Sequence, residues 1–269
     1  MKLIIAGAAG RMGRAILDSL YHEEDLELGA ALEKKGHPAV GRDAGELIGI
    51  GKWKVPLTDQ VKKAVPAGDA IIDFTSPQNT IALLQEAAAK GKPMVIGTTG
   101  FISEEEKKIE KAAEKIPIVL SPNMSVGVNL LFKLLAEAAE ALGEAYDIEI
   151  VEMHHRQKKD APSGTALRMA EVLARARKTP LSQVGRFSRQ GNIGPRPSGE
   201  IGIQTLRGGD VVGDHTVVFA GPGERIEMTH RAHSRNNFAR GALLAARWVA
   251  QQPPGLYDMM DVLNLKNRS

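Results

Sequence analysis

The side chains best suited to chemistry gather in one short stretch, residues 152–167, with the sequence EMHHRQKKDAPSGTAL. Two histidines end the apolar run 148–153, a basic segment follows, and a turn at 160–162 leads into Ser-Gly-Thr at the start of a helix. A histidine supplies a proton near neutral pH, and a lysine supplies positive charge, or a proton where its pKa is lowered. We therefore expect this stretch to bind a small molecule that carries carboxylates.

The spacing of the reactive side chains sets a condition on the backbone. Side chains alternate along a strand, so Glu152, His154 and Lys158 share one face. In a straight strand, His154 and Lys158 would stand roughly 13 Å apart, at about 3.3 Å per residue. The chain must therefore curl after His155 if both side chains serve one substrate.

The Ser-Gly-Thr segment is expected to complete the site. Ser163 can cap a helix that begins near Thr165. The backbone N–H groups of Gly164 and Thr165 would then face a carboxylate of the substrate, helped by the helix dipole.

Other interpretations of these residues stay open. Adjacent histidines at a strand end also occur as surface or hydrogen-bonded structural residues. The chain has no HxH, HExxH or acid cluster at ligand spacing beside them, which argues against a metal site. The basic run lacks interleaved aromatic residues, which argues against nucleic acid. We interpret His215, His230 and His233, in or near predicted strands, as structural.

A second group of residues has the form of a dinucleotide-binding turn. An apolar strand over 2–6 runs into Gly7, Ala8, Ala9, Gly10, Arg11, Met12 and Gly13, a helix follows, and a strand over 26–32 ends at Glu33. The glycines allow a pyrophosphate to approach the helix N-terminus, and the acid can accept a hydrogen bond from a ribose hydroxyl. The spacing is GxxGxxG rather than GxGxxG, so a purely structural turn is the alternative.

The residues after Glu33 leave the choice of cofactor open. An acid at this position favours NAD, whereas Lys34 or Lys35 can pair with the 2′-phosphate of NADP. The alternative for these lysines is a solvated loop. The prediction is therefore NAD(P)H, with no preference between the two forms.

Strands alternate with helices through the first 125 residues, which predicts a Rossmann-type, doubly wound parallel sheet of the α/β class. Ligands bind beyond the carboxyl ends of such strands. Two further segments follow strand ends and are expected to line the cofactor: Gly97, Thr98 and Thr99, and Ser121, Pro122, Asn123 and Met124.

The pattern changes after a long helix over 126–142. Strands are expected at 147–153, 200–206, 214–220 and 225–230, with one clear helix over 165–177 and a long mobile loop over 182–199. This predicts a C-terminal α+β domain with an open mixed sheet. We expect a dinucleotide-binding domain over 1–125, completed by a helix and tail at 235–269, and a substrate-binding and oligomerisation domain over 126–234.

Composition limits the class of protein. The chain has 269 residues, 43% of them hydrophobic, a net charge of +3 and no cysteine. Without cysteine there are no disulfides and no thiol nucleophile, which fits a reducing cytoplasm. No apolar run approaches the roughly 18 residues of a membrane span, so we expect a cytoplasmic protein without membrane partners.

The chain resembles the bacterial dihydrodipicolinate reductases, also called 4-hydroxy-tetrahydrodipicolinate reductases. The signature of that family is matched by HHRQKKDAPSGTA, residues 154–166. Further matches follow the order of the chain at 7–13, Glu33, 73–75, 97–101, 123–129 and 208–213. Lys34 stands where some members carry arginine, and Ser76 where some carry a basic residue.

The resemblance implies a reaction and a set of roles. Family members reduce the cyclic product of dihydrodipicolinate synthase to tetrahydrodipicolinate in lysine and diaminopimelate biosynthesis, usually as homotetramers joined through sheets of the second domain. It implies that His154 is the acid/base residue and Lys158 the proton donor, while His155, Gly164 and Thr165 hold a dicarboxylate substrate. The cofactor would contact 7–12, Glu33, 97–99 and 121–124.

Two rival functions stay open. A dehydrogenase of the homoserine type shares the expected fold but does not explain the block at 154–166. A non-catalytic dinucleotide-sensing module would keep the glycine turn and Glu33 but would not need His154, Lys158 and an anion-binding turn together.

Overall fold

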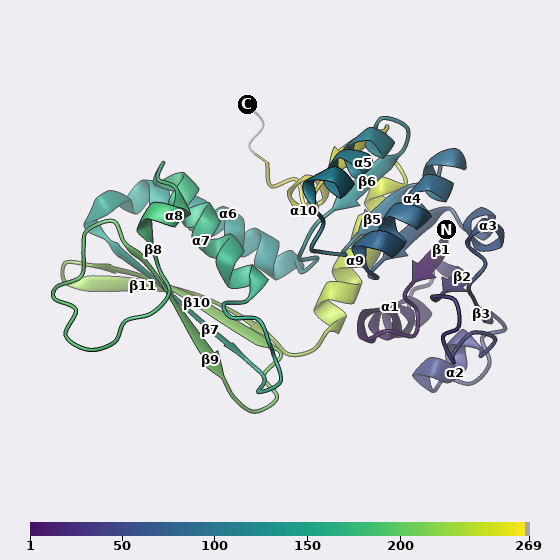
Figure 1. Ribbon diagram of the computed structural model, residues 1–269, viewed down its shortest axis with the longest axis horizontal. Coiled ribbons are helices and arrows are strands. Elements are labelled where there is room, and N and C mark those ends of the chain that lie inside the picture. The colour runs from purple at the N-terminus through teal and green to yellow at the C-terminus, as the bar shows by residue number, and fades with distance from the viewer. Residues whose placement is uncertain (267–269) are drawn as a thin grey trace. The chain divides into compact units, whose positions relative to one another are not determined.

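The computed structural model describes residues 1–266 and divides the chain into two compact units (Figure 1). The first unit comprises residues 1–126 together with the chain from Arg235 onward, and the second comprises Gly127–Ser234. Each unit has its own sheet and its own hydrophobic core.

The first unit is built on a seven-stranded sheet in the order β12-β6-β5-β4-β1-β2-β3, in which every pair of neighbours is parallel. The predicted doubly wound parallel sheet is therefore confirmed. Strand order reverses at β1, so the loop after β1 lies where ligands bind in such sheets. The strands are β1 (Lys2–Ala6), β2 (Glu27–Leu32), β3 (Leu57–Thr58), β4 (Ala70–Asp73), β5 (Met94–Ile96), β6 (Pro117–Leu120) and β12 (Gly255–Tyr257).

Alternation along β1 shows why helices are needed on both faces of this sheet. Leu3 and Ile5 point into the core that contains residues of α1 and α9, whereas Ile4 belongs to the core formed with α4 and α5. All three side chains are fully buried. The helices of this unit are α1 (Arg11–Tyr21), α2 (Ala44–Ile48), α3 (Val61–Ala64), the 3-10 helix η1 (Val65–Ala67), α4 (Pro77–Ala89), α5 (Ser103–Ala113), α9 (Asn236–Val249) and α10 (Met259–Val262).

The second unit has a five-stranded sheet in the order β11-β10-β7-β9-β8. Strands β7, β9 and β8 run parallel, while β10 is antiparallel to both β7 and β11, which confirms the predicted mixed sheet. The strands are β7 (Asp147–His154), β8 (Gly185–Arg186), β9 (Ile201–Arg207), β10 (Gly213–Gly221) and β11 (Glu224–Ala232). The helices are α6 (Val126–Leu142), the 3-10 helix η2 (Gly143–Ala145), α7 (Gly164–Ala176) and α8 (Leu181–Val184).

One face of this second sheet packs against α6 and α7. Ile148 and Ile150 of β7 are fully buried in a core that also contains Leu135 of α6 and Met169 of α7. Because side chains alternate along a strand, Val151 of β7 points to the opposite face. The same alternation aligns the reactive residues of β7 with the helix-covered face.

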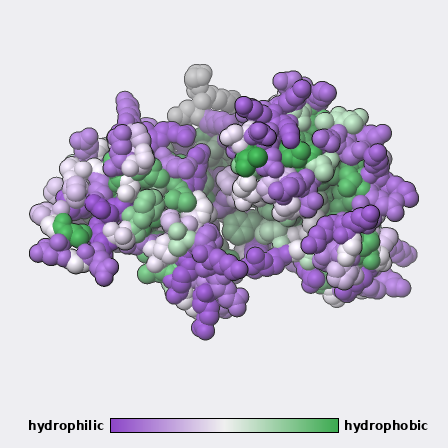
Figure 2. All heavy atoms as spheres, viewed as in Figure 1, coloured by the Kyte–Doolittle hydropathy of each residue, from purple (hydrophilic) through white to green (hydrophobic). Residues whose placement is uncertain are grey.

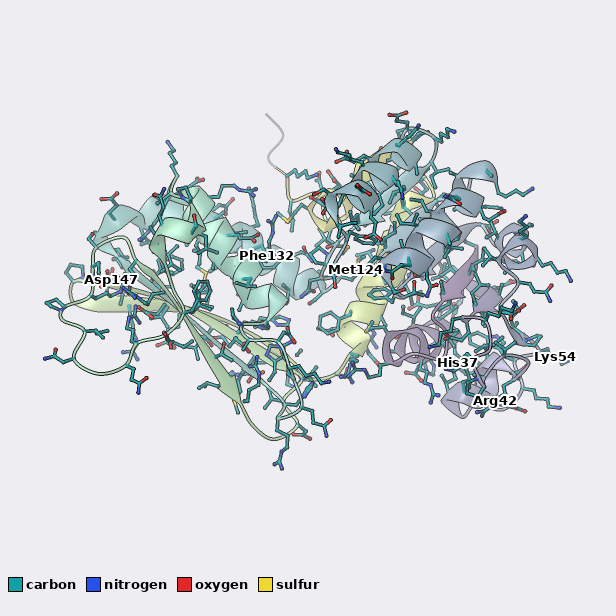
Figure 3. All side chains as sticks on the ribbon, viewed as in Figure 1. His37, Arg42, Lys54, Met124, Phe132 and Asp147 are labelled. Carbon is teal, nitrogen blue, oxygen red and sulfur yellow. The ribbon has the colours of Figure 1, made fainter. Side chains whose placement is uncertain are left out.

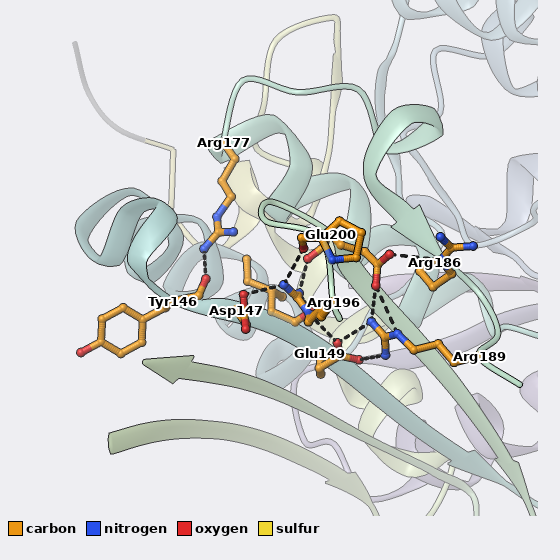
Figure 4. Close-up of polar contacts among 10 residues, drawn as sticks. Tyr146, Asp147, Glu149, Arg177, Arg186, Arg189, Arg196 and Glu200 are labelled. Atoms are coloured by element: carbon orange, nitrogen blue, oxygen red, sulfur yellow. Dashed lines mark hydrogen bonds and ion pairs between the residues drawn. The ribbon is translucent and has the colours of Figure 1, made fainter. Parts of the chain in front are cut away.

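The segment over 182–199, expected to be a long mobile loop, is irregular from residue 187 onward but not at its start. Its start is regular, because α8 ends at Val184 and β8 pairs with β9. Its later part is anchored by arginines (Figure 4): Arg189 donates to Glu149 at 2.7 and 2.9 Å, and Arg196 donates to Asp147 at 2.5 Å. A two-residue strand and ion pairs to a distant strand leave no periodic signal in the sequence, so neither could be predicted from it.

Candidate active site

The chain turns sharply where β7 ends at His154. The His155 N–H donates to the Val211 carbonyl at 2.8 Å, and the Lys158 N–H closes a turn on the His155 carbonyl at 3.1 Å. The Gly208 N–H donates to the His154 carbonyl at 2.9 Å. The segment after β9 therefore holds the curl that the spacing of His154 and Lys158 required.

A buried carboxylate–imidazole contact lies at the end of β7. Nδ1 of His154 lies 2.5 Å from Oε2 of Glu152, two residues earlier on the same face of the strand. Glu152 is fully buried and His154 is 8% exposed. Burial alone would raise the pKa of Glu152, but hydrogen bonds from His154, Arg207 and the Ser163 N–H outweigh it and lower the pKa to about 2. The carboxylate is thus ionised beside the imidazole.

Neighbouring strands and the turn saturate the Glu152 carboxylate. Arg207 at the end of β9 donates Nη1–H to Oε2 at 2.9 Å and Nη2–H to Oε1 at 3.0 Å, the two-pronged geometry that a guanidinium favours. Oε1 also accepts from the Ser163 N–H at 3.0 Å and from the Thr205 hydroxyl at 3.2 Å. One buried carboxylate therefore joins two strands and the turn before α7.

His215, interpreted from the sequence as structural, stands beside this pair. Its ring lies edge-on to the His154 ring with centroids 5.1 Å apart, and its Nε2 lies 3.0 Å from the Ser163 hydroxyl. That hydroxyl accepts from the Ala166 N–H at 3.2 Å, so its own proton can be donated to a neutral His215. Burial and the neighbouring His154 lower the pKa of His215 to about 3.

The pKa of His215 predicts that the protein loses stability in acid. An unfolded histidine has a pKa of about 6.5, so below that pH the unfolded chain takes up a proton that the folded chain rejects. The free energy of unfolding should therefore fall as pH drops from about 6.5 toward 3, by up to about 1.4 kcal/mol per pH unit from this site. Urea unfolding at about pH 7 and pH 5 measures the slope.

The variant His215→Gln isolates this contribution to acid lability. It should flatten the slope of the free energy of unfolding against pH. The slope that remains comes from other groups such as His230, whose pKa is also lowered by burial. Glu152 contributes at lower pH, because a lowered carboxylate pKa gives stability that is lost only as pH falls from about 4.5 toward 2. An unchanged slope in His215→Gln between pH 7 and 5 would contradict the assignment.

The remaining residues of the predicted substrate site follow this pair along the chain. The Nζ of Lys158 lies 2.8 Å from Oδ2 of Asp160, and its side chain is 20% exposed. Helix α7 begins at Gly164 with Ser163 as its N-cap, so the predicted cap is confirmed. No other atom lies within 4 Å of where a Cβ of Gly164 would stand, which leaves open space at this N-terminus.

The first unit contains a cavity of about 620 Å³ at the carboxyl ends of its strands. It gathers residues from the turn after β1, the end of β2 and the start of α4. Of the predicted cofactor residues, Gly7, Ala9, Gly10, Glu33 and Lys34 line it, whereas the segments 97–99 and 121–124 do not. The lining residues are Ala6, Gly7, Ala9, Gly10, Leu32, Glu33, Lys34, Lys35, His37, Asp59, Val61, Phe74, Thr75, Ser76, Asn79, Ala82 and Leu83.

Glu33 secures the glycine turn from the end of β2. Its carboxylate accepts from the Ala9 N–H at 3.1 Å and from the Lys34 N–H at 3.0 Å. Gly7 has a positive φ of 75°, and its carbonyl accepts from the Gly10 N–H at 2.9 Å. The turn is thus held by a hydrogen bond within it and by a second one to Glu33. Gly10 is the N-cap of α1, and because it has no side chain, it leaves the first N–H groups of the helix without a side-chain cap.

The other predicted cofactor residues vary in exposure. Ala8 is fully buried, Arg11 is exposed, and the Thr98 hydroxyl accepts from the Thr75 N–H at 3.0 Å. Ser121 is buried and donates to the Asn123 carbonyl at 2.9 Å. The Met124 side chain, labelled in Figure 3, is 1% exposed and packs in the core.

Several residues at these sites had no assigned role in the sequence-based prediction. Arg207 and Thr205 lie on β9, and Asp59 follows β3, a strand of only two residues. His37, labelled in Figure 3, lies in the irregular segment after β2. Asp59 could have been found as a polar residue that follows a parallel strand. The strand in question, β3, has only two residues, which are too few to be recognised in the sequence.

Within residues 1–266, no group of three or more histidine, cysteine, aspartate or glutamate side chains is placed to hold a metal ion.

In the same range, no helix has the length and apolarity needed to span a membrane. Hydrophilic residues predominate on the face of each unit that Figure 2 shows.

A parallel sheet with a glycine turn closed by an acid, in a chain that also has a buried carboxylate–imidazole pair, is typical of oxidoreductases that bind a dinucleotide. Residues 1–124 match the family model described as dihydrodipicolinate reductase, N-terminus, and residues 127–263 match its C-terminus. The chain belongs to the dihydrodipicolinate reductase family.

Individual relatives agree with this placement. The chain is 52% identical to 4-hydroxy-tetrahydrodipicolinate reductase of Syntrophus aciditrophicus and 51% identical to that of Geotalea daltonii, in each case over 99% of this chain and 100% of the relative. A dipicolinate-bound dihydrodipicolinate reductase from Paenisporosarcina sp. TG-14 has a similar structure, with a TM-score of 0.76, 25% identity, and coverage of 97% of this chain and 98% of that one.

Proposed function

We propose that His154 and Lys158 supply the proton, and bound NAD(P)H the hydride, in the reduction of 4-hydroxy-tetrahydrodipicolinate to tetrahydrodipicolinate. This is a step of lysine and diaminopimelate biosynthesis. One hydride and one proton add and one water leaves, which balances the reaction. The observation that carries the proposal is the buried Glu152–His154 pair at the turn that leads to the N-terminus of α7.

The charge of the substrate explains the rest of this site. A dicarboxylate matches the positive N-terminus of α7, where Gly164 leaves open space, together with His155 and Lys158. Hydride addition to an unsaturated ring places an electron pair on a neighbouring atom, which a positioned acid then protonates. The relative that binds dipicolinate, itself a dicarboxylate, supports this substrate class.

The test is oxidation of NADH or NADPH with substrate made in place by dihydrodipicolinate synthase from pyruvate and aspartate semialdehyde. We expect oxidation of either cofactor only when the synthase is present. Folded protein that binds a reduced cofactor but never oxidises it would overturn the proposal and favour the dinucleotide sensor.

The cavity of the first unit supports use of both cofactors. The Glu33 carboxylate lies at the turn, where it can accept from a ribose hydroxyl, while exposed Lys34 and Lys35 line the same cavity and can pair with a 2′-phosphate. The double variant Lys34→Ala/Lys35→Ala should raise KM for NADPH about tenfold and leave KM for NADH nearly unchanged. Steady-state kinetics with each cofactor measure this, with Lys108→Ala on exposed α5 as the control.

An equal rise in both KM values would contradict the 2′-phosphate role of these lysines. A rise in KM for NADPH in the Lys108→Ala control would show a general effect of lost surface charge instead.

We also propose a cytoplasmic homotetramer assembled through the sheet of the second unit. The face of this sheet away from α6 and α7 carries apolar side chains, among them Val151 and Leu206, and Leu206 is 49% exposed. Such a surface favours association with a second sheet. Sedimentation equilibrium of the wild type and of Leu206→Glu tests the assembly, because a buried charge at the interface should dissociate it.

A further inference from the structure

We propose that Glu152 is a positioning residue, which holds His154 with its proton on Nδ1 and thereby leaves Nε2 as the atom that exchanges a proton with the substrate. This inference rests on the proposed function, because it assumes that His154 is the acid/base residue. It adds a residue, an atom and a tautomer to that function.

The tautomer follows from the partner of the imidazole. An ionised carboxylate only accepts hydrogen bonds, so the contact of 2.5 Å between Nδ1 and Oε2 places a proton on Nδ1. A neutral His154 then has its lone pair on Nε2, and a protonated His154 has its transferable proton there. The same carboxylate stabilises the imidazolium, because the two opposite charges lie in a buried site.

The Glu152 carboxylate is itself immobilised. Arg207 donates hydrogen bonds to both oxygens, and the Ser163 N–H and the Thr205 hydroxyl also donate to Oε1. Nη2 of Arg207 also donates to the Asp160 carbonyl at 2.6 Å. A rotation of the carboxylate would break several of these bonds at once, so the imidazole is held against a fixed acceptor.

The surroundings of the ring allow little other orientation. A Cβ added to Gly213 would lie 2.9 Å from Nε2 of His154, so the ring lies directly against this glycine. On another side, the ring of His215 meets it edge-on at an interplanar angle of 77°. His215 has a hydroxyl as its partner, whereas His154 faces the carboxylate that fixes its tautomer, so the two imidazoles are not equivalent.

The first test reads the tautomer in the wild-type protein. Protein labelled with 15N only at histidine gives two ring-nitrogen shifts for each residue, and His154 is assigned by its loss in His154→Asn. At a pH where the ring is neutral, we expect Nδ1 to have the shift of a protonated nitrogen and Nε2 that of an unprotonated one. A neutral His154 with its proton on Nε2 would overturn the proposal, whatever the activity.

The second test removes the charge of Glu152 while keeping its shape. Glu152→Gln should lower kcat about a hundredfold, as expected for a general acid held in the wrong tautomer, with KM for substrate and cofactor within about twofold of wild type. The proton of neutral His154 should move to Nε2, because a glutamine side chain can donate to Nδ1. Glu152→Asp, which keeps the charge, should have a kcat at least about ten times that of Glu152→Gln.

A matched control separates positioning from general destabilisation. Glu200 is also buried and also paired with arginines, Arg186 and Arg189, but it lies before the start of β9, at the end opposite Arg207 (Figure 4). Glu200→Gln should lower stability and leave kcat and the His154 tautomer unchanged.

The outcomes distinguish the two levels of the proposal. If the wild type showed no synthase-dependent oxidation of NADH or NADPH, the proposed function would be wrong, but the tautomer measurement would still be valid. An active wild type with an equally active Glu152→Gln, or an equal loss of kcat in Glu200→Gln, would overturn the positioning role alone. If Glu152→Gln does not fold, the wild-type tautomer decides the question.

Discussion

Replacement of His154 by alanine is expected to lower kcat by roughly two or more orders of magnitude, with NAD(P)H binding unchanged. The buried Glu152 carboxylate orients this imidazole at the end of β7, so its loss removes the positioned proton donor. Lys158→Ala should also lower kcat, because Lys158 stands at the turn after His155. Synthase-coupled oxidation of NADH measures kcat, and fluorescence titration measures cofactor affinity.

Exposed neighbours of the same chemical types serve as controls. His233→Ala removes an exposed imidazole of the second unit, and Lys159→Ala removes the exposed lysine next to Lys158. Both should retain wild-type kcat. If His154→Ala kept wild-type turnover, the assignment of the acid/base residue would be wrong. In a non-catalytic dinucleotide sensor, the same change would leave cofactor binding unaltered and there would be no turnover to lose.

Gly13→Ala is expected to weaken cofactor binding at least tenfold and to destabilise the first unit. A Cβ at Gly13 would lie 2.1 Å from the Gly7 carbonyl oxygen and 2.7 Å from Cα of Ala8, distances that the backbone of the turn must move to relieve. Overpacking of this kind costs about 1–3 kcal/mol, more than the gain in helix propensity of about 0.5–1 kcal/mol. Urea unfolding and titration with NADH measure the two effects.

A second variant of α1 separates loss of stability from displacement of the turn. Ala15→Gly lies on the same helix and should cost about 0.5–1 kcal/mol in helix propensity, in addition to the loss of a partly buried methyl group, with cofactor affinity unchanged. Equal affinity of Gly13→Ala and wild type for NADH would contradict the role of this close contact in shaping the pyrophosphate site.

Local patterns were sufficient for most of the fold. Strand, glycine turn and helix at the start of the chain, and alternating apolar strands and helices through the first 125 residues, predicted a parallel sheet, and the structure has one. Ser163 was predicted as the cap of α7 from its place before a helical pattern, and its hydroxyl accepts from the Ala166 N–H. These features depend on interactions over a few residues, which the order of residue types displays directly.

The segment 182–199 marks the limit of such patterns. It contains glycine, proline and serine without periodicity and was expected to form a mobile loop, yet β8 pairs with β9 and Arg189 is bonded to Glu149. Ion pairs between distant residues are invisible to a local reading, because any exposed arginine looks the same in the sequence.

The sequence by itself determined the two fold classes, the curl after His155 and the chemical character of the stretch around His154. Only the tertiary structure decided what surrounds that histidine. Sheet pairing sets His215 opposite Glu152 and Arg207 opposite His154. Strand register depends on hydrogen bonds and packing between segments far apart in the chain, so no local pattern could place these two side chains beside the imidazole.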